Sequence, residues 1–275
     1  MRKTLVLFAL ASSAAFADTL CADLTTLFAS GTCNGAFFQQ IIPRPTGSGV
    51  IDPFIRISTN LGIEEGLNTD ARPYGLNNEA QDTATFDHSE ALSLINIATG
   101  SMQLENGLIL PGPSTQKYLQ LMLDINQTGS SPLLSLDELV IALSNTKTDN
   151  PAITLDGSGR PTIPTLAGSV IFNLDAGAVD RWIALNYALD TGSGSGDMFA
   201  FVPVTAAQIA ACGAGCDVEV YSAFGLQGGA YQNNDGYEEW SAVRAAPTSS
   251  GVPEPSALWL AGAGLALVAL RRTKV

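Results

Sequence analysis

The feature that most constrains the fold is a regular alternation of residues in the middle of the chain. In residues 118–126, every second residue is leucine or isoleucine, and these apolar residues are separated by Gln120, Met122 and Asp124. Neighbouring side chains of an extended strand point to opposite faces of a sheet. The alternation therefore predicts a half-buried β-strand that packs one face against a core.

The same period of two recurs along much of the chain. Turn sequences rich in Gly, Asn and Asp stand between the alternating runs, as in residues 156–159 and 233–236. Because no long helical period separates them, we predict an all-β ectodomain, an antiparallel β-sandwich or jelly roll. Short helices are expected only at residues 22–28 and 206–211. Further strands are predicted at residues 51–57 (weakened by Pro53), 91–98, 138–144, 169–174, 182–189, 198–204 and 218–224.

The first 17 residues predict a secretory signal peptide. Arg2 and Lys3 form a basic start, residues 4–15 are apolar, and the segment ends in Ala-Phe-Ala. A small-x-small sequence of this kind is a cleavage site of the secretion machinery. We therefore expect cleavage after Ala17, so that Asp18 becomes the first residue of the mature chain.

The last 23 residues join three chemically different pieces. Pro253, Glu254 and Pro255 form a stiff, extended segment, because proline fixes φ and disfavours helix in the residue before it. Residues 257–270 are uncharged and apolar, and two arginines and a lysine follow them. A helix of this length covers about 21 Å, which makes it a marginal membrane span, and the basic end should stay cytoplasmic. A buried core helix is the alternative, but the arginine pair argues against it.

This order of pieces resembles the C-terminal sorting signal of the PEP-CTERM proteins, exported proteins of Gram-negative bacteria that an exosortase processes. Further blocks extend the resemblance over about residues 90–275; they are residues 123–127, 134–139, 197–203, 221–225 and 234–240. The resemblance implies an exported, surface-associated β protein, often found in bacteria that make exopolysaccharide. It implies no established activity.

The chain is accordingly expected to have four parts. Residues 1–17 are the signal peptide, residues 18–244 the β-sandwich ectodomain, residues 245–252 a linker rich in Ala, Pro, Ser and Gly, and residues 253–275 the sorting signal with its short hydrophobic helix. The protein would be held transiently in the inner membrane and then reach the cell surface or the medium.

The charge balance excludes one class of partner. The formal net charge is −13. The two terminal segments hold five of the basic residues and one acid, so residues 18–252 hold 8 basic and 25 acidic residues, a net charge of −17. Such a field repels nucleic acid and anionic lipid, and it attracts divalent cations. We expect no nucleic-acid partner.

All four cysteines lie in the predicted exported part of the chain. An even count in an oxidising compartment favours disulfides. Proximity in sequence favours the pairs Cys21–Cys33 and Cys212–Cys216, and the two glycines inside the second ring permit its tight path. A zinc site is the alternative, but the spacing is wrong and the one histidine, His88, stands in an unrelated segment.

Calcium is the metal whose chemistry fits the sequence best. Ca²⁺ takes six to eight oxygen ligands, often from Asp and Asn side chains in loops. Asp124 and Asn126 share one face at the end of a predicted strand, and Asp137 lies at the start of the next. A hairpin between these strands would bring the three residues together as a Ca²⁺ site. The alternative is that Asp124 and Asn126 start a turn by hydrogen-bonding to their own backbone.

No catalytic constellation is predicted. The sequence lacks a G-x-S-x-G elbow. The residues on either side of His88 would point to the opposite face of a strand, so a Ser-His-Asp triad would need serines that are distant in the sequence. The acid pairs at residues 64–65 and 238–239 would serve a glycosidase only if they lay across a sugar bond. The second pair is expected to be polar residues beside a turn that lead Trp240 into the core. We therefore expect no enzymatic activity.

The resulting prediction is an exported protein of the cell envelope or extracellular matrix, with a structural or interaction role in biofilm or exopolysaccharide. Its expected partners are an exosortase-type enzyme, the secretion machinery and exopolysaccharide. A calcium-supported carbohydrate-binding module is the first alternative, and a secreted glycan hydrolase is the second.

Overall fold

A computed structural model describes the central part of the chain in two sheets. The residues described are 18–41, 53–58, 63–68, 116–146, 165–177, 179–192, 196–213 and 215–243, together with the backbone of 90–91, 97–99, 102–103 and 109–110. All of them belong to a compact unit of residues 1–244, and residues 245–275 form a second unit. The predicted signal peptide, linker, sorting segment and His88 lie outside the described residues. Among the helices that are described, none is both long and apolar enough to cross a membrane.

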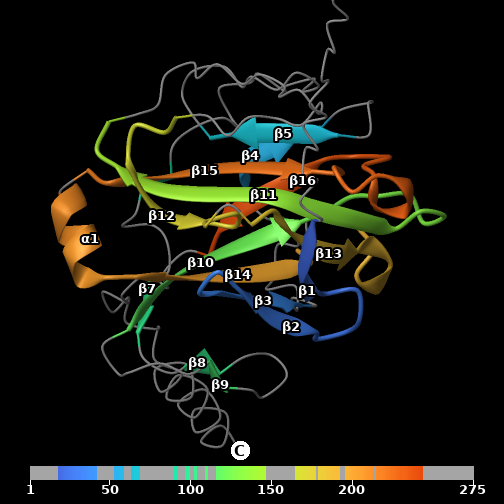
Figure 1. Ribbon diagram of the computed structural model, residues 1–275, viewed down its shortest axis with the longest axis horizontal. Helices are drawn as coiled ribbons and strands as arrows, with labels where there is room; N and C mark the ends of the chain where they lie inside the picture. The colour runs from blue at the N-terminus through green and yellow to red at the C-terminus, as the bar shows by residue number, and fades with distance from the viewer. Residues whose placement is uncertain are drawn as a thin grey trace, which may run out of the picture. The chain divides into compact units, whose positions relative to one another are not determined.

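The first sheet has seven strands in the order β1-β13-β11-β15-β5, with β12 paired to β11 and β6 to β15. We refer to it as sheet A (Figure 1). Its strands are β1 (Thr19–Asp23), β5 (Glu64–Leu67), β6 (Glu90–Ala91), β11 (Leu133–Ser144), β12 (Ser169–Asn173), β13 (Arg181–Asn186) and β15 (Asp217–Phe224).

The second sheet, sheet B, also has seven strands, in the order β2-β3-β14-β10-β16-β4, with β7 paired to β10. Its strands are β2 (Ser30–Cys33), β3 (Ala36–Gln40), β4 (Pro53–Ile57), β7 (Ile97–Thr99), β10 (Lys117–Asp124), β14 (Met198–Val204) and β16 (Glu238–Ala242). A separate two-stranded sheet consists of β8 (Met102–Gln103) and β9 (Ile109–Leu110).

The all-β class that the alternation predicts is confirmed. All but one of the described strand pairings are antiparallel; in the exception, β1 runs parallel to β13, with Thr19 opposite Arg181. Leu119, Leu121 and Leu123 of β10 are fully buried in the one large core, which also takes side chains from sheet A. The alternation of β10 therefore turns its leucines towards the opposite sheet, as a two-layer packing requires.

Trp240 connects the two sheets through the middle of the core. The sequence predicts a core position for this residue, and its side chain is fully buried. Its indole Nε1–H donates a hydrogen bond of 3.0 Å to Ser222 Oγ on β15 of sheet A. A buried indole needs such a partner for its N–H, so this contact fixes β16 against β15 as well as filling the core.

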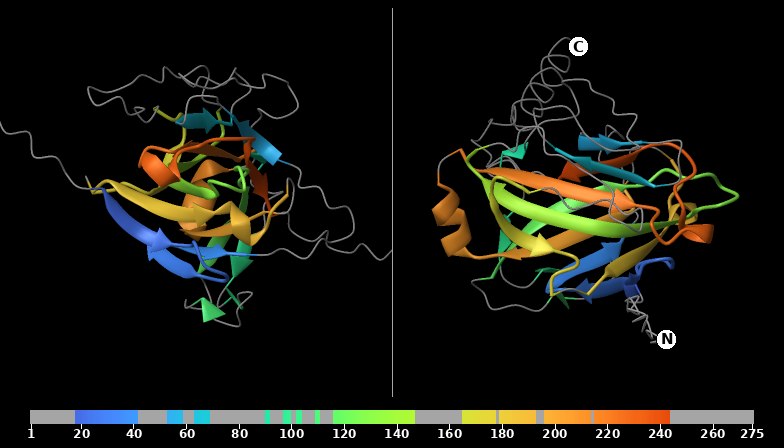
Figure 2. Two further views of the ribbon diagram at one scale, coloured as in Figure 1. Left: turned by 90° about the vertical axis from the view of Figure 1, so that its right-hand side faces the viewer. Right: turned by 45° about the horizontal axis from the view of Figure 1, so that its top comes forward.

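One helix closes an end of the two sheets. Helix α1 (Ala206–Cys212) leads from β14 of sheet B to β15 of sheet A, as Figure 1 and the right-hand view of Figure 2 show. It begins at a capping box in which Thr205 and Gln208 satisfy each other's backbone N–H groups. It ends at Gly213, whose φ of 78° suits glycine, and the predicted disulfide Cys212–Cys216 follows. The prediction of a helix at residues 206–211 is confirmed.

The predicted helix at residues 22–28 is wrong. Residues 19–23 form β1 instead, because they pair with β13 and because Cys21 is bonded to Cys33. After the strand, the Asp23 carboxylate accepts hydrogen bonds from both the N–H and the hydroxyl of Thr25, which commits the chain to a turn. The strand predicted at residues 182–189 also ends early, where Asn186 caps the 3₁₀-helix η2 (Tyr187–Leu189).

The hairpin that the calcium site would require, between residues 118–126 and the strand that contains Asp137, does not form. β10 belongs to sheet B and β11 to sheet A, and the two do not pair. The connection crosses from one sheet to the other, and Pro132 stands directly before β11. Each strand instead finds partners far away in the sequence: β14 and β16 for β10, and β13 and β15 for β11.

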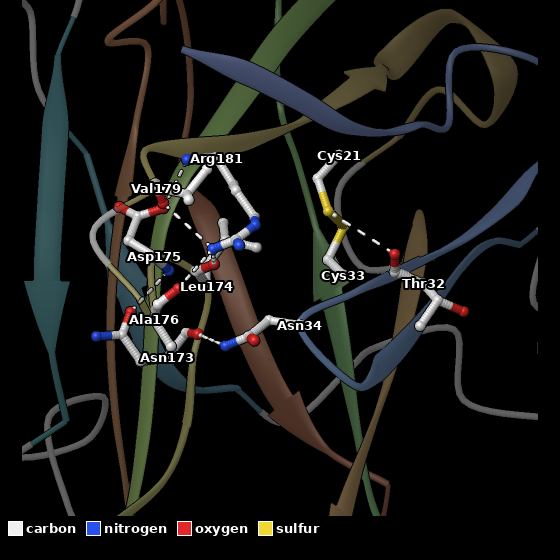
Figure 3. The surroundings of a disulfide bond; sticks show 10 residues. All are labelled: Cys21, Thr32, Cys33, Asn34, Asn173, Leu174, Asp175, Ala176, Val179 and Arg181. Atoms are coloured by element: carbon white, nitrogen blue, oxygen red, sulfur yellow. Dashed lines mark hydrogen bonds between the residues drawn. A yellow bond between two sulfur atoms is a disulfide. The ribbon is translucent and has the colours of Figure 1, made fainter. Parts of the chain in front are cut away.

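A disulfide joins the two sheets at one edge. Cys21 lies on β1 of sheet A and Cys33 on β2 of sheet B, with their Cα atoms 5.6 Å apart (Figure 3). Beside this bond, Asn34 Nδ2 donates a hydrogen bond to the Asn173 carbonyl of β12, which adds a second contact between the layers. The Cys21–Cys33 pairing predicted from sequence proximity is therefore present, and it is an inter-sheet connection.

Candidate functional site: a buried carboxyl cluster

Carboxyl groups gather at the end of the sheets opposite α1. Asp124 is the last residue of β10, Asp197 stands directly before β14, and Glu238 is the first residue of β16. β10 is antiparallel to both β14 and β16, so these three positions meet, with Leu123 opposite Met198. The three acids are 0–3% exposed. The site is therefore built by strand register and not by a single loop.

Glu64 and Glu238 form the inner part of this cluster. Glu64 is the first residue of β5 in sheet A, and its side chain is fully buried, as is that of Glu238. The two carboxyl groups are hydrogen-bonded to each other. Ionised carboxylates only accept hydrogen bonds, so this contact requires a proton on one of them. The pair thus links sheet A to sheet B.

Two side-chain amides hold the pair in place. Gln127 Nε2 donates to Glu238 Oε1 and to Asn233 Oδ1, both at 3.0 Å. Asn233 Nδ2 in turn donates to Glu64 Oε2 at 3.0 Å. Each carboxyl therefore receives an amide N–H, and the amides are linked to each other. Such a connected network fixes the geometry of buried polar groups.

Burial makes the pair hold its proton tightly. Desolvation, with a smaller contribution from the negative charge of Asp124, raises the pKa of Glu238 to about 7. Hydrogen bonds from Glu64, from the Gln127 side chain and from the Asn126 N–H, the last at 3.4 Å, act in the opposite direction but do not cancel the effect of burial. Glu238 therefore titrates near neutral pH and not in the usual carboxyl range.

Asp197, directly before β14, also has a raised pKa. Its Oδ2 accepts a hydrogen bond of 2.8 Å from the Ile125 N–H, whereas its buried Oδ1 has no hydrogen-bond partner. Burial raises its pKa well above the ordinary value, and the negative charges of Asp124, Asp190 and Glu238 add to this effect. Asp124 Oδ1 accepts a hydrogen bond of 3.2 Å from the Gly196 N–H. These contacts couple Asp124 and Asp197 to the inner pair.

The three residues of the predicted calcium site are not brought together. Asp124 belongs to the cluster, and Asn126 reaches it through its backbone N–H. Asp137 instead accepts hydrogen bonds from Ser135 Oγ at 2.7 Å and from the Leu226 N–H at 2.8 Å, because β11 lies in the other sheet. In the described part of the chain, no group of three or more His, Cys, Asp and Glu side chains is arranged to hold a metal ion. Calcium binding stays a prediction.

The acid pairs considered for a glycosidase are each divided between two faces of their strands. Glu65 turns away from Glu64, and its Oε2 accepts a hydrogen bond of 2.8 Å from the Tyr221 hydroxyl. Glu239 turns away from Glu238 and forms an ion pair with Arg56. The carboxyl groups that do meet, Glu64 and Glu238, are fully buried, so they are not placed to meet a sugar chain. As expected, the pair at residues 238–239 follows a turn and leads Trp240 into the core, and Glu238 is itself buried.

Sequence reasoning missed Glu64, Asp197 and Asn233 as members of the site. A signal for Glu238 existed, because it stands two residues before Trp240 and therefore on the same inward face of the strand. For Glu64 and Asp197 the signal lies only in the strand pairings, which join parts of the chain that are distant in sequence.

One comparison identifies the C-terminal segment. Residues 251–272 match the family model of the PEP-CTERM protein-sorting motif, so the chain carries the sorting motif that its last residues resemble. This motif implies an exported protein that an exosortase processes at the membrane. Pro253, Glu254 and Pro255 lie within the match. No curated protein and no solved structure matches the chain.

Proposed function

We propose that this protein is a component of the cell envelope or extracellular matrix with a structural or interaction role in biofilm or exopolysaccharide. The observation that carries the proposal is the sorting motif at residues 251–272, attached to a two-sheet β domain with two disulfides. Disulfides persist in proteins that work outside the cell because their surroundings are oxidising.

The charges of the β domain support the same role. Its described side chains include only three cations, and two of them are engaged within the domain. Arg56 pairs with Glu239, and Arg181 donates to the carbonyl oxygens of Leu174, Ala176 and Val179. The excess of carboxylates leaves a hydrated, negatively charged surface that repels anionic polymers such as nucleic acid. Neutral polysaccharides and cationic groups are the partners that this surface suits.

The test uses a producing strain from which the protein has been deleted. Wild-type protein should restore the amount of polysaccharide retained by the cells and should itself be recovered from the surface or the medium at its processed mass. A variant with Pro253, Glu254 and Pro255 replaced by alanine should stay unprocessed in the inner membrane and restore nothing. Unchanged polysaccharide retention in the deletion strain would contradict the proposed role. Normal processing of the alanine variant would contradict the route.

A further inference from the structure

We propose that the Glu64–Glu238 carboxyl pair is a proton-dependent link between the two sheets. With Glu238 protonated, the pair holds the β5 edge of sheet A to β16 of sheet B; loss of the Glu238 proton places a negative charge in the buried contact and weakens the attachment of that edge. The link is independent of the sorting motif and of the proposed role in the matrix.

The link joins the edge strand of sheet A to the strand next to the edge of sheet B. β5 is the last strand in the order of sheet A, and β4, the neighbour of β16, is the last strand in sheet B. β4 and β5 are in contact, and Figure 1 shows them side by side. Glu64 and Glu238 each begin their strand, so the link holds the strands where they start.

A shared proton accounts for a buried atom that otherwise lacks a donor. With both groups ionised, Glu238 Oε2 is buried and has no hydrogen-bond partner. A proton between the Glu64 and Glu238 carboxyls supplies the missing donor. A buried carboxylate without that donor carries the full cost of desolvation. A charge on Glu238 remains costly even with that donor, because the carboxyl is fully buried, so the pair in which Glu238 also holds a proton is the stable form of the link.

The groups that face Glu238 from the neighbouring elements make a second negative charge unfavourable. Asp124 faces it from the end of β10 and Asp197 from the start of β14. Asp190, which follows η2, acts on Asp197 in the same sense. Acidic side chains from two neighbouring strands therefore face Glu238, and a third acts on one of them.

The described cations do not offset this charge. Arg56 lies on β4 next to β16, but it pairs with Glu239 on the other face and stacks on Tyr237, with its guanidinium carbon 4.7 Å from the ring centroid. Lys117 is at the opposite end of β10 from Asp124, about 24 Å away along an eight-residue strand.

The direction of the pH dependence follows from the unfolded state. An unfolded glutamate titrates near pH 4.3, whereas burial raises the pKa of folded Glu238 to about 7. The folded protein therefore binds this proton more tightly than the unfolded chain does. The contribution of the Glu238 proton to the free energy of unfolding is complete below about pH 4, decreases as the pH rises, and is lost above about pH 7. The raised pKa of Asp197 acts in the same direction.

The first test measures the melting temperature of the exported protein between pH 5 and pH 8.5, with EDTA present to remove divalent cations. The wild type should lose about 5–10 °C over this range. Glu238→Gln keeps the shape, supplies an N–H donor and cannot ionise, so it should lose clearly less. Glu239→Gln, on the opposite face of the same strand, is the matched control and should follow the wild type. A pH-independent wild type, or a Glu238→Gln slope equal to that of the wild type, would overturn the proposal.

Hydrogen exchange locates the effect. After correction for the pH dependence of intrinsic exchange, the amides of residues 64–67 and 238–242 should exchange faster above pH 7 in the wild type than in Glu238→Gln. Those of residues 200–204, near α1, should not. An equal increase in all strands would show that the link is not the part that opens. If Glu238→Gln does not fold, Glu64→Gln undergoes the same two measurements with the same expected results.

Discussion

The two sheets are joined at both edges, but the two connections depend on different chemistry. At one edge the covalent Cys21–Cys33 bond ties β1 to β2. At the other, the hydrogen-bonded carboxyls of Glu64 and Glu238 tie β5 to β16. The first connection does not depend on the pH and fails on reduction, whereas the second is weakened when Glu238 loses its proton. A domain built in this way keeps one edge closed while the other responds to the medium.

Removing the covalent connection should have the largest effect on stability. The double substitution Cys21→Ser and Cys33→Ser should lower the free energy of unfolding by about 3 kcal/mol, because the unfolded chain regains the entropy of an open loop. The loss should be the same at pH 5 and at pH 8.5, and denaturant titration at both values measures it.

The matched control is the other disulfide. Cys212→Ser with Cys216→Ser opens a ring with a sequence separation of 4 instead of 12, so it should cost about 2 kcal/mol. If the loss of unfolding free energy caused by Cys21→Ser with Cys33→Ser grows with pH, the two edges are coupled and do not respond independently.

A third connection, through the middle of the core, should give an intermediate effect. Trp240→Phe removes the indole N–H that bonds Ser222 Oγ and should cost about 1–2 kcal/mol, because a buried hydroxyl loses its partner and volume is lost as well. Adding Ser222→Ala should recover part of this loss. Thermal melts at pH 5 and pH 8.5 should give equal values, since no group in this contact titrates. If the double variant is no more stable than the single one, the hydrogen bond does not connect the sheets energetically.

The contrast between the two edges also shows what sequence reasoning can reach. Cys21 and Cys33 are near each other in the chain, so their pairing follows from spacing. The alternation at residues 198–204 likewise gives β14 with its bounds. Glu64 and Glu238 meet only because β5, the edge strand of sheet A, lies near β16, which is next to the edge strand of sheet B, and no local pattern encodes that placement. The misplaced helix at residues 22–28 has the same origin, because the pairing of β1 with β13 outweighs local helix propensity.

The smallest expected effect is that of calcium. Measuring it shows whether a cation or only protons neutralise the buried carboxyl cluster. Asp124 lies beside Asp197 and Glu238, so a divalent cation that binds there would replace protons as the counter-charge. The calcium prediction then expects CaCl₂ to raise the melting temperature at pH 8.5 by a few degrees, corresponding to about 1 kcal/mol at ten times the dissociation constant, and less at pH 5, where protons compete. Asp124→Asn should abolish the shift, and Asp137→Asn, whose carboxylate is bonded to Ser135 and Leu226, should leave it unchanged. Equal melting temperatures with CaCl₂ and with EDTA at pH 8.5 would contradict calcium binding and leave the proton as the only counter-charge of this edge.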